Sequence, residues 1–236
     1  TQRHVVILGG TGFVGRHLVA RLLQGGDRVT VLSRGTDAAK RRLKPQGASL
    51  IEGDVANADF LAAVLDDADA VVNLVGILNE KGDRGDGFER VFVGITDALI
   101  DAMKRMGVRR LLQMSALNAG RGESHYLQSR GRAEQRIRAS GLDWTLFRPS
   151  VIAGPGDSLF CRFDGLLKFA PVLPIGRADA RFQPVWVGDV VDAYAKALDE
   201  PRCVGQAYDL IGPDVLSLRH IGKLAARGQG RERMGI

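Results

Sequence analysis

Hydrophobic and polar positions alternate between two spacings along residues 4–147. Short, nearly continuous apolar runs are typical of strands buried on both faces, and they lie at 4–8, 29–32, 49–51, 70–75, 110–114 and 144–147. Between these runs, apolar side chains recur every three or four residues, which predicts helices at 13–24, 37–44, 57–66, 88–103 and 124–140. Strands that alternate with helices form parallel βαβ units. The pattern therefore predicts an α/β fold of the Rossmann type, a doubly wound parallel sheet with helices on both faces.

After Pro149 the alternation of strand-like and helix-like spacings is lost, and it returns at residue 184. Three prolines interrupt residues 150–181, where no clear period is visible. Further elements are expected as a strand at 184–187, a helix at 189–199 with Asp189 as its N-cap, a strand at 206–211 and a helix at 217–226. We therefore predict a single Rossmann domain over 1–236, in which 150–181 and 200–236 form a small C-terminal, substrate-side lobe.

A glycine loop stands between the first predicted strand and the first predicted helix. Gly9, Gly12 and Gly15 follow one another at intervals of three residues. A diphosphate needs a tight turn, a backbone without Cβ in the way and free N–H groups at a helix N-terminus. The three glycines supply the turn, the close approach and the packing of the helix on the strand, and the alternative is a merely structural turn. The residues expected to hold a dinucleotide here are Gly9, Thr11, Gly12, Phe13, Val14 and Gly15.

The end of the second strand indicates which nicotinamide dinucleotide is preferred. An acid there would bind the ribose 2′-hydroxyl and repel a 2′-phosphate. Here the strand ends in Ser33 and Arg34, and Arg16 lies near the start of the first helix. A guanidinium can bind a phosphate bidentately, so NADP(H) is favoured over NAD(H). Asp37 argues against this preference, although its place before a predicted helix also fits an N-cap.

A carboxylate follows the third predicted strand as well. Asp54 stands there between Gly53 and Val55. At a strand end its carboxylate can accept a hydrogen bond from an adenine amino group. An aspartate at this point is equally typical of a turn. The residues alone leave both interpretations open.

Composition and charge fit a folded domain with anionic partners. The chain has 236 residues, 45% of them hydrophobic and 25% charged, which excludes a disordered chain. Its net charge of +6 and isoelectric point near 9.7 favour a phosphorylated cofactor, a nucleic acid or an acidic membrane surface. Aromatic residues are only 6% and do not interleave with Lys or Arg, so we expect no nucleic-acid partner. A solvated basic surface is the simpler alternative.

Cysteines, histidines and apolar segments further limit the possible classes. Cys161 and Cys203 form no disulfide framework and match no zinc spacing, and the four histidines are scattered, so we expect a reducing compartment and no metal site. No apolar run approaches the roughly 18 residues of a membrane span, and no signal peptide is visible. The first residue is Thr1, which is typical of a trimmed chain.

Together, these motifs resemble the short-chain dehydrogenase/reductase superfamily, in its extended and atypical branches. The matching motifs are GGTGFVG, the GDV after the third strand, the NLVG after the fourth and the RP after the sixth. The stretches 111–119, 143–157 and 182–193 are similar to the branch that contains the NADPH-binding accessory subunit of respiratory complex I and its bacterial relatives. Sugar-nucleotide epimerases share a diluted form of the same motifs.

The resemblance implies that the ends of the later strands also line the cofactor site. For Arg148, the residues alone allow a place beside the nicotinamide or a simple pairing with an acid. The further cofactor-binding residues expected are Gly53, Asp54, Val55, Leu74, Val75, Gly76, Met114, Arg130, Arg148, Pro149, Ser150 and Val151.

The catalytic set of the superfamily is Ser, Tyr and Lys, with the last two in a Y-x-x-x-K motif. The matching residues are Ser115 and Tyr126, but Arg130 stands where the lysine is expected. Positions i and i+4 share a helix face, and a nearby cation lowers the pKa of a tyrosine. Arg130 can do this and can bind ribose hydroxyls, but it does not readily release a proton. The alternative for Ser115 is a hydroxyl at a strand end that hydrogen-bonds a backbone group. The alternative for Tyr126 is an ordinary half-buried aromatic residue of a helix.

Three functions are compatible with these features. The first is an NADPH-dependent oxidoreductase with a quinone or carbonyl substrate. The second is a non-catalytic nucleotide-binding subunit, structural or regulatory, of a respiratory complex, which the replacement of lysine by Arg130 favours. The third, a sugar-nucleotide epimerase or dehydratase, is disfavoured by the small region after Pro149. We expect a cytoplasmic location, at the inner face of the respiratory membrane for the second function, while no feature predicts the oligomeric state.

Overall fold

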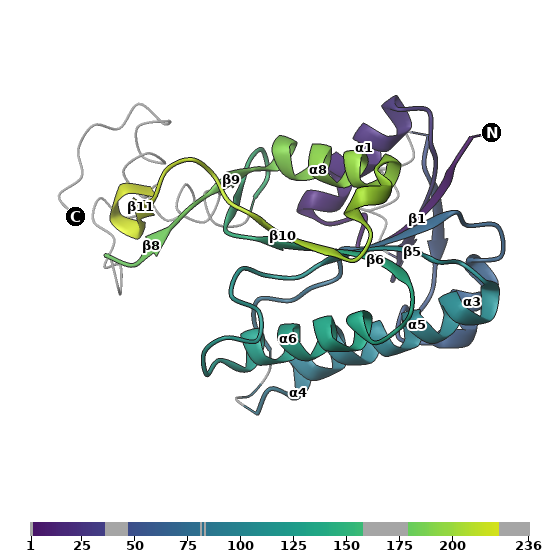
Figure 1. The fold of residues 1–236 in the computed structure, drawn as a ribbon, viewed down its shortest axis with the longest axis horizontal. Helices are drawn as coiled ribbons and strands as arrows, with labels where there is room; N and C mark the ends of the chain where they lie inside the picture. The colour runs from purple at the N-terminus through teal and green to yellow at the C-terminus, as the bar shows by residue number, and fades with distance from the viewer. Residues whose placement is uncertain (1, 36–46, 81, 83, 158–178, 222–236) are drawn as a thin grey trace. The chain divides into compact units, whose positions relative to one another are not determined.

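The computed structural model describes residues 2–35, 47–80, 82, 84–157 and 179–221. It divides into two compact units, of which the first comprises Thr1–Arg148 with Val191–Asp209. A sheet of seven strands lies at the centre of this first unit (Figure 1). The strands of the sheet are β1 (His4–Leu8), β2 (Arg28–Ser33), β3 (Ser49–Glu52), β4 (Ala70–Asn73), β5 (Arg110–Met114), β6 (Asp143–Pro149) and β10 (Gln206–Leu210).

The strand order shows how the chain winds. It runs β10-β6-β5-β4-β1-β2-β3, so the chain first builds outward from β1 to β3 and then crosses to β4 on the other side of β1. Neighbouring pairs from β3 to β6 are parallel, with Leu8 opposite both Leu32 and Asn73. This is the order of a Rossmann fold, in which ligands bind beyond the carboxyl ends of the strands where the order reverses. That point lies here between β1 and β4, and the predicted fold is confirmed.

Helices cover both faces of the sheet, as the sequence predicts. Figure 1 shows α1 (Phe13–Gln24) and α8 (Val187–Asp199) on one face, and α3 (Ala58–Val64), α5 (Ile95–Met106) and α6 (His125–Arg138) on the other. The strands have apolar side chains on both faces because both are covered. In the core beneath α3, α5 and α6, fully buried strand residues such as Val6, Leu8 and Val71 pack with Leu99 and Ile137.

The helix predicted over 88–103 is three consecutive segments. A short turn α4 (Asp86–Phe88) leads into a π-helix (Glu89–Gly94), and α5 follows. The extra residue per turn in a π-helix shifts the positions that face the core. Phe88 and Phe92 stack on one another, with ring centroids 5.8 Å apart. Short π-helical segments of this kind often occur at functional sites.

The second unit comprises Pro149–Val190 and Leu210–Ile236. Its described part contains two short strand pairs. The pairs are β7 (Ile152–Ala153) with β9 (Val185–Trp186), which is parallel, and β8 (Arg181–Phe182) with β11 (Leu216–Ser217), which is antiparallel. The strand expected at 184–187 is thus the two-residue β9, and a helix begins at residue 218.

One predicted helix begins earlier than expected, and two others lie wholly or partly outside the described residues. The helix expected at 189–199 begins at Val187, so the prediction that Asp189 is its N-cap is wrong. Asp189 lies in the first turn instead, where a carboxylate interacts favourably with the helix dipole. The helix expected at 37–44, including Asp37, and residues 222–226 of the last predicted helix lie outside the described residues.

Candidate functional site

The glycine loop connects β1 to α1 at the point where the strand order reverses. Gly9 has φ +79°, which a residue with a side chain rarely adopts, as the tight turn requires. A Cβ added to Gly9 would lie 3.0 Å from the carbonyl carbon of Leu74 and 3.1 Å from the amide nitrogen of Val75. The loop therefore packs directly against the chain that leaves β4. This brings two of the predicted strand ends together.

Gly12 and Gly15 serve different purposes in the loop. Gly12 is the N-cap of α1, in extended conformation, and a Cβ there would meet only the Gly9 oxygen, at 3.2 Å. No described side chain caps α1, and its first turn holds no acid. A Cβ on Gly15 would lie 2.4 Å from the Gly9 oxygen and 2.5 Å from the Gly10 Cα. Gly15 therefore allows the first turn of α1 to pack closely on the glycine loop, whereas the expected close contact was with the strand. An uncapped helix start beside an open glycine fits a dinucleotide diphosphate.

The ends of β2 and β3 carry the residues expected to select the adenosine. Ser33 is buried, and its hydroxyl accepts a hydrogen bond from the Gly35 amide at 3.3 Å, whereas Arg34 is exposed. The Asp54 carboxylate accepts from the Ala56 amide at 3.0 Å, so it does form the turn that its residue type allows. Val55 is part of the hydrophobic core. Of these groups, the Arg34 guanidinium is the one exposed cation at the strand ends among the residues described.

The buried Arg130 side chain lies at the ends of β4 and β5. Its Nη1 donates to the Met114 carbonyl at 2.8 Å, and its guanidinium lies 3.8 Å from the centre of the Phe92 ring. A Cβ added to Gly76 would be 2.7 Å from Nη2, so a side chain there would displace the guanidinium from its present position. Burial lowers the pKa of Arg130 from its ordinary value, and the Tyr126 hydroxyl offsets part of this effect. The guanidinium is thus fixed between a carbonyl, an aromatic face and Gly76.

Tyr126 shares a helix face with Arg130, as their spacing predicts. Its ring is half-buried and meets the rings of Phe88 and Phe92 edge-on, with centroids 5.6 and 5.5 Å away. The Arg130 guanidinium is 5.5 Å from the Tyr126 ring centre. Ser124 caps α6 by accepting from the Leu127 amide. The two members of the predicted Y-x-x-x-R motif are therefore brought together, inside an aromatic cluster built by the π-helix.

Ser115 does not present its hydroxyl proton to an open space. The side chain is 3% exposed, and its hydroxyl donates to the Glu134 carboxylate at 2.6 Å. Arg148 holds the same carboxylate with two hydrogen bonds, of 2.8 and 2.5 Å. Glu134 raises the pKa of the Arg148 guanidinium, mainly through these hydrogen bonds. For Arg148, the pairing with an acid that the sequence allowed is what the structure shows.

Glu134 was missed by sequence reasoning, although a signal was present. It lies four residues after Arg130 and eight after Tyr126, so all three project from one face of α6. An acid on a buried helix face needs a partner, because an unpaired buried charge is costly. This reasoning would have indicated a buried ion pair near the predicted catalytic residues.

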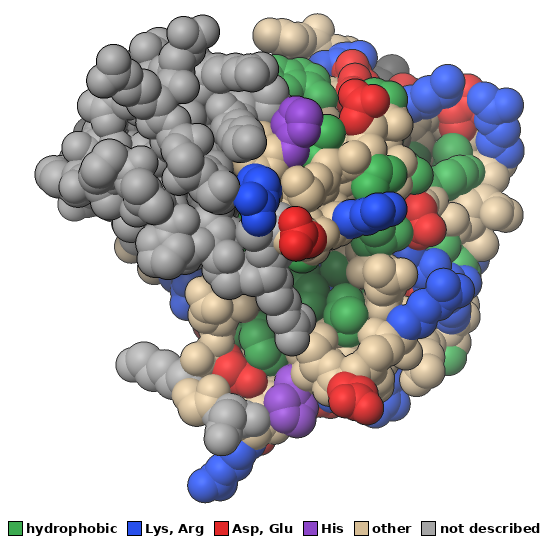
Figure 2. All heavy atoms as spheres, turned by 90° about the vertical axis from the view of Figure 1, so that its left-hand side faces the viewer, with side chains coloured by type: hydrophobic (Ala, Val, Ile, Leu, Met, Phe, Trp, Pro, Cys, Tyr) green, Lys and Arg blue, Asp and Glu red, His purple; other side chains and the backbone are tan. Residues whose placement is uncertain are grey.

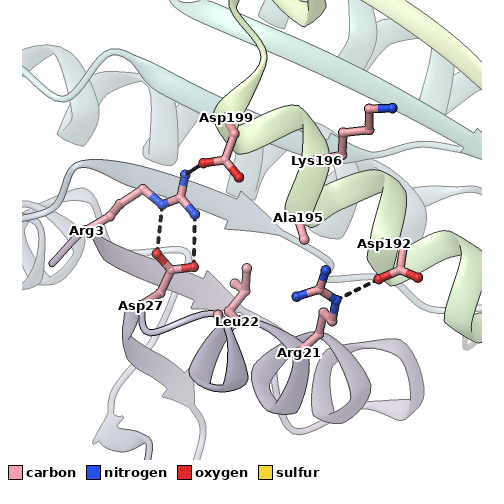
Figure 3. Close-up of a pocket in the computed structure, with 9 residues that line it drawn as sticks. Arg3, Arg21, Leu22, Asp27, Asp192, Ala195, Lys196 and Asp199 are labelled. Atoms are coloured by element: carbon pink, nitrogen blue, oxygen red, sulfur yellow. Dashed lines mark hydrogen bonds and ion pairs between the residues drawn. The ribbon is translucent and has the colours of Figure 1, made fainter.

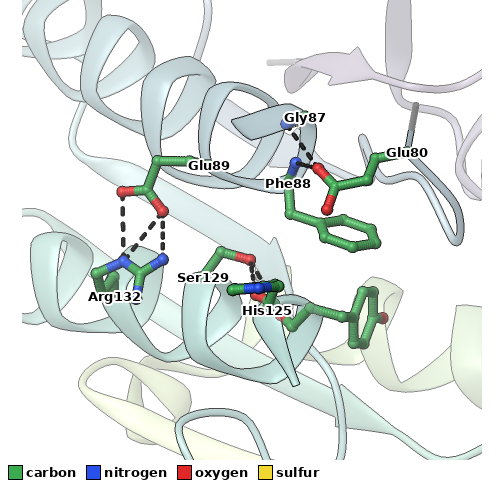
Figure 4. A network of polar contacts seen from close by, with 8 residues as sticks. Glu80, Gly87, Phe88, Glu89, His125, Ser129 and Arg132 are labelled. Atoms are coloured by element: carbon green, nitrogen blue, oxygen red, sulfur yellow. Dashed lines mark hydrogen bonds and ion pairs between the residues drawn. The ribbon is translucent and has the colours of Figure 1, made fainter. Parts of the chain in front are cut away.

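A second polar network joins α6 to the helix that carries the aromatic cluster (Figure 4). The Glu80 carboxylate accepts from the amides of Gly87 and Phe88, at 2.7 and 3.1 Å, and so caps α4. Glu89 pairs with Arg132 of α6 at 2.5 Å. These contacts hold the π-helix against α6. The network therefore supports the position of Phe92 under Arg130.

The predicted residues of the second unit have their own partners. The Ser150 amide donates to the Leu210 carbonyl at 2.9 Å. The Val151 carbonyl accepts from the Val185 amide, also at 2.9 Å. The Ser150 amide therefore extends the pairing of β6 with β10 by one residue, and the Val151 carbonyl lies beside the pair of β7 and β9.

Comparison with known proteins identifies the family. A family model described as NAD(P)H-binding matches residues 9–158. The chain belongs to this NAD(P)H-binding family. The match begins at the first glycine of the loop and extends past Arg148, so it contains the loop, the strand ends and the Glu134 cluster described above.

The relatives of this NAD(P)H-binding chain place it among the atypical short-chain dehydrogenases/reductases. It is 32% identical, over 92% of its length, to "NADH dehydrogenase [ubiquinone] 1 alpha subcomplex subunit 9, mitochondrial" of Arabidopsis thaliana, of which it covers 56%. It is 30% identical, over 78% of its length, to "Ceramide reductase" of Caulobacter vibrioides, of which it covers 57%. The chain thus spans a little over half the length of these curated relatives. The resemblance to the complex I accessory subunit is confirmed.

A solved structure has the same fold as this chain. The UDP-glucose 4-epimerase of Thermotoga maritima, determined with UDP-glucose, has a TM-score of 0.87 and 17% sequence identity to this chain. The match covers 99% of this chain and 84% of the epimerase. At this identity the match shows that the NAD(P)H-binding chain shares the epimerase fold.

Another depression in the first unit lies away from the glycine loop (Figure 3). It has a volume of about 380 Å³ and lies near the amino ends of β1 and β2, opposite the loop. Arg3 binds Asp27 with two hydrogen bonds, of 3.0 and 2.9 Å, and Asp199 with a third, of 2.6 Å. Arg21 pairs with Asp192 at 2.6 Å. Both arginines that line the depression are therefore paired with carboxylates of the chain itself.

The surface charges of this NAD(P)H-binding protein are mixed. On the face drawn in Figure 2, Lys and Arg side chains of the described part lie among Asp and Glu side chains rather than in one patch. No described helix has the length and apolar character that a membrane span needs.

Proposed function

We propose that this protein binds NADPH in the glycine loop and keeps it as a resident nucleotide that stabilises the fold. The observation that carries this proposal is the loop itself. The α1 N-terminus is uncapped by described side chains, and Gly12 leaves the space in front of it open. A ligand that binds only the folded state stabilises it, so a resident nucleotide would contribute directly to stability.

The preference for NADPH rests on Arg34. Its exposed guanidinium follows β2, where the adenosine ribose of a dinucleotide is bound in this fold. A charge-assisted, bidentate contact to a 2′-phosphate would then distinguish the two nicotinamide dinucleotides. Ser33, by contrast, is buried and directed toward the Gly35 amide.

The contacts of Ser115 argue against an efficient carbonyl reductase. A carboxylate paired with Arg148 can only accept hydrogen bonds, so Ser115 must donate its proton to Glu134. A substrate carbonyl needs a donor where negative charge develops. Because the Ser115 proton is used by Glu134, the hydroxyl has only acceptor lone pairs left for a substrate carbonyl. Arg130, fixed against Phe92, does not supply a proton to Tyr126.

The second candidate is an NADPH-dependent oxidoreductase, which the contact between Tyr126 and Arg130 favours. The Arg130 guanidinium lies 5.5 Å from the Tyr126 ring centre, so a cation and a hydroxyl that can donate a proton share this helix face. A quinone acceptor needs less help from the protein than a carbonyl, since it can take its proton from water. The relative named ceramide reductase supports a reductase, whereas the relative named as a dehydrogenase subunit supports a bound, accessory role. We favour the accessory role, in association with a respiratory complex at the membrane surface.

One experiment tests the proposal and separates the two candidates. Purified protein is titrated with NADPH and with NADH, and binding is followed by nicotinamide fluorescence and by thermal denaturation. We expect saturable binding that is tighter for NADPH, and stabilisation of about 2.7 kcal/mol at a hundredfold excess over Kd. Carbonyl and quinone acceptors are then added to the saturated protein. Turnover of an acceptor would establish the oxidoreductase, and absence of binding would overturn both candidates.

A further inference from the structure

An acidic side chain from β3 lies at the end of β2. The two strands are parallel, and Glu52 pairs in register with Ser33. The Gly53 amide donates to the Ser33 carbonyl at 3.0 Å, which extends the pairing by one residue. Glu52 therefore stands at the same height in the sheet as the residues that were expected to select the cofactor.

The Glu52 carboxylate lies over Gly35. A Cβ added to Gly35 would be 2.3 Å from Oε2 and 2.8 Å from Cδ of Glu52. Gly35 also has φ +74°, so a side chain there would be strained and would displace the Glu52 carboxylate. Its amide donates to Ser33, which fixes the turn. The chain thus brings a carboxylate onto the residue that follows Arg34.

The position of Gly35 matters because of its distance from the glycine loop. In dinucleotide-binding folds the acid that binds the ribose 2′-hydroxyl lies about 20 residues beyond the loop. Gly35 follows Gly15 by 35 − 15 = 20 residues, and it has no side chain. Glu52 lies 17 residues further along the chain, yet its carboxylate reaches this place from the neighbouring strand.

We propose that Glu52 replaces the acid that β2 lacks and accepts a hydrogen bond from the ribose 2′-hydroxyl of NADH. This inference rests on dinucleotide binding at the glycine loop. Arg34 and Glu52 then act in opposite directions. The guanidinium attracts a 2′-phosphate, while the carboxylate repels it and binds the free hydroxyl. The protein consequently accepts both dinucleotides, and the balance of these two side chains determines its preference.

The test is a set of variants titrated with NADPH and with NADH. Glu52→Gln keeps the size of the side chain and removes its charge. Losing a hydrogen bond to a charged group, together with a repulsion, corresponds to a shift of about tenfold in the affinity ratio toward NADPH. Arg34→Gln should shift the ratio in the opposite direction. The matched control is Asp66→Asn, an exposed carboxylate that precedes β4 at its amino end and changes the net charge equally.

Thermal denaturation of each variant shows whether it is folded. The proposal predicts weaker NADH binding and tighter NADPH binding for Glu52→Gln, and an unchanged ratio for Asp66→Asn. If Glu52→Gln binds both dinucleotides with the starting ratio, or shifts it no more than Asp66→Asn does, Glu52 does not contact the ribose, while the proposed function stands. If the unaltered protein binds neither dinucleotide, the proposed function fails and this inference with it.

Discussion

The two ends of the candidate site differ in how their polar groups are used. At the glycine loop, the α1 N-terminus has no described side-chain cap, and Gly12 leaves the approach to it open. At α6, the Ser115 hydroxyl and the Arg148 guanidinium both bind Glu134, and Arg130 is held by Met114 and Phe92. One end is open to a ligand. At the other end the Ser115, Glu134 and Arg148 groups are paired with one another, and the Arg130 Nε is the buried atom that has no partner among the described residues of this cluster. On the proposed function, this difference separates nucleotide binding from hydride chemistry within one fold.

The largest effect is expected from a substitution that disrupts the Glu134 cluster, and it concerns the free energy of unfolding. Glu134→Ala leaves Ser115 and the partly exposed Arg148 without their carboxylate, and the loss of hydrogen bonds to a buried charged group costs about 1.5–3 kcal/mol. The free energy of unfolding, measured in urea, should fall by that amount. Glu89→Ala is the control, since Glu89 and Arg132 form an exposed pair whose loss should cost less than about 1 kcal/mol. Equal costs would show that Glu134 is no more important than a surface charge.

The next effect concerns the open end. Arg34→Asp places a carboxylate beside the expected 2′-phosphate and removes a charge-assisted contact, which is worth about 1.5–3 kcal/mol. The Kd for NADPH should rise at least about tenfold, and the preference over NADH should narrow or reverse. Fluorescence titration of both dinucleotides checks this. If both affinities stay as they are in the unaltered protein, Arg34 does not contact the nucleotide.

A smaller effect is expected from restoring the lysine of the superfamily. Arg130→Lys introduces a group that can exchange a proton next to Tyr126. We expect the turnover of carbonyl substrates to rise a few-fold from a low starting value, as measured by NADPH oxidation. The rise should be limited because Ser115 still donates to Glu134. A decrease in turnover would mean that the guanidinium itself takes part in catalysis.

The smallest effect is expected from Tyr126→Phe. This substitution keeps the ring that packs against Phe88 and Phe92 and removes only the hydroxyl. A positioned general acid contributes about 10² to 10⁴ in rate, whereas a half-buried structural aromatic contributes almost nothing. We expect NADPH consumption to change less than about twofold. A loss in the range of a general acid would establish the oxidoreductase instead.

The elements nearest the glycine loop could be predicted from the sequence in detail. The strand at His4–Leu8 and the helix at Phe13–Gln24 have their predicted bounds, because one is a continuous apolar run, the other has a regular apolar period, and glycines lie between them. The π-helix could not be predicted in this way. Apolar residues at 88, 92, 95, 99 and 103 fit a continuous helix as well as one with an inserted residue.

The candidate site was only partly visible in the sequence for a related reason. The spacing of Gly9, Gly12 and Gly15 reflects local backbone geometry, which a sequence motif records directly. Glu134 and Glu52 act across elements, through a contact of α6 with the strand ends and through the register of β2 and β3. Such contacts depend on tertiary packing. The spacing on α6 indicates that the acid at 134 needs a partner, but a single sequence does not show which residues of other elements supply it.

The central claim, that the open glycine loop holds the nucleotide, is tested most directly by titrating Gly12→Val with NADPH. The backbone of Gly12 is extended, and a Cβ there meets only the Gly9 oxygen at 3.2 Å, so valine should be accommodated in the fold once that carbonyl shifts by a few tenths of an ångström. The side chain would then fill the space in front of the α1 N-terminus. We predict a melting temperature close to that of the unaltered protein without nucleotide, and NADPH binding weakened by at least about a hundredfold, or 2.7 kcal/mol. Binding of NADPH with unchanged affinity to this folded variant would contradict the account.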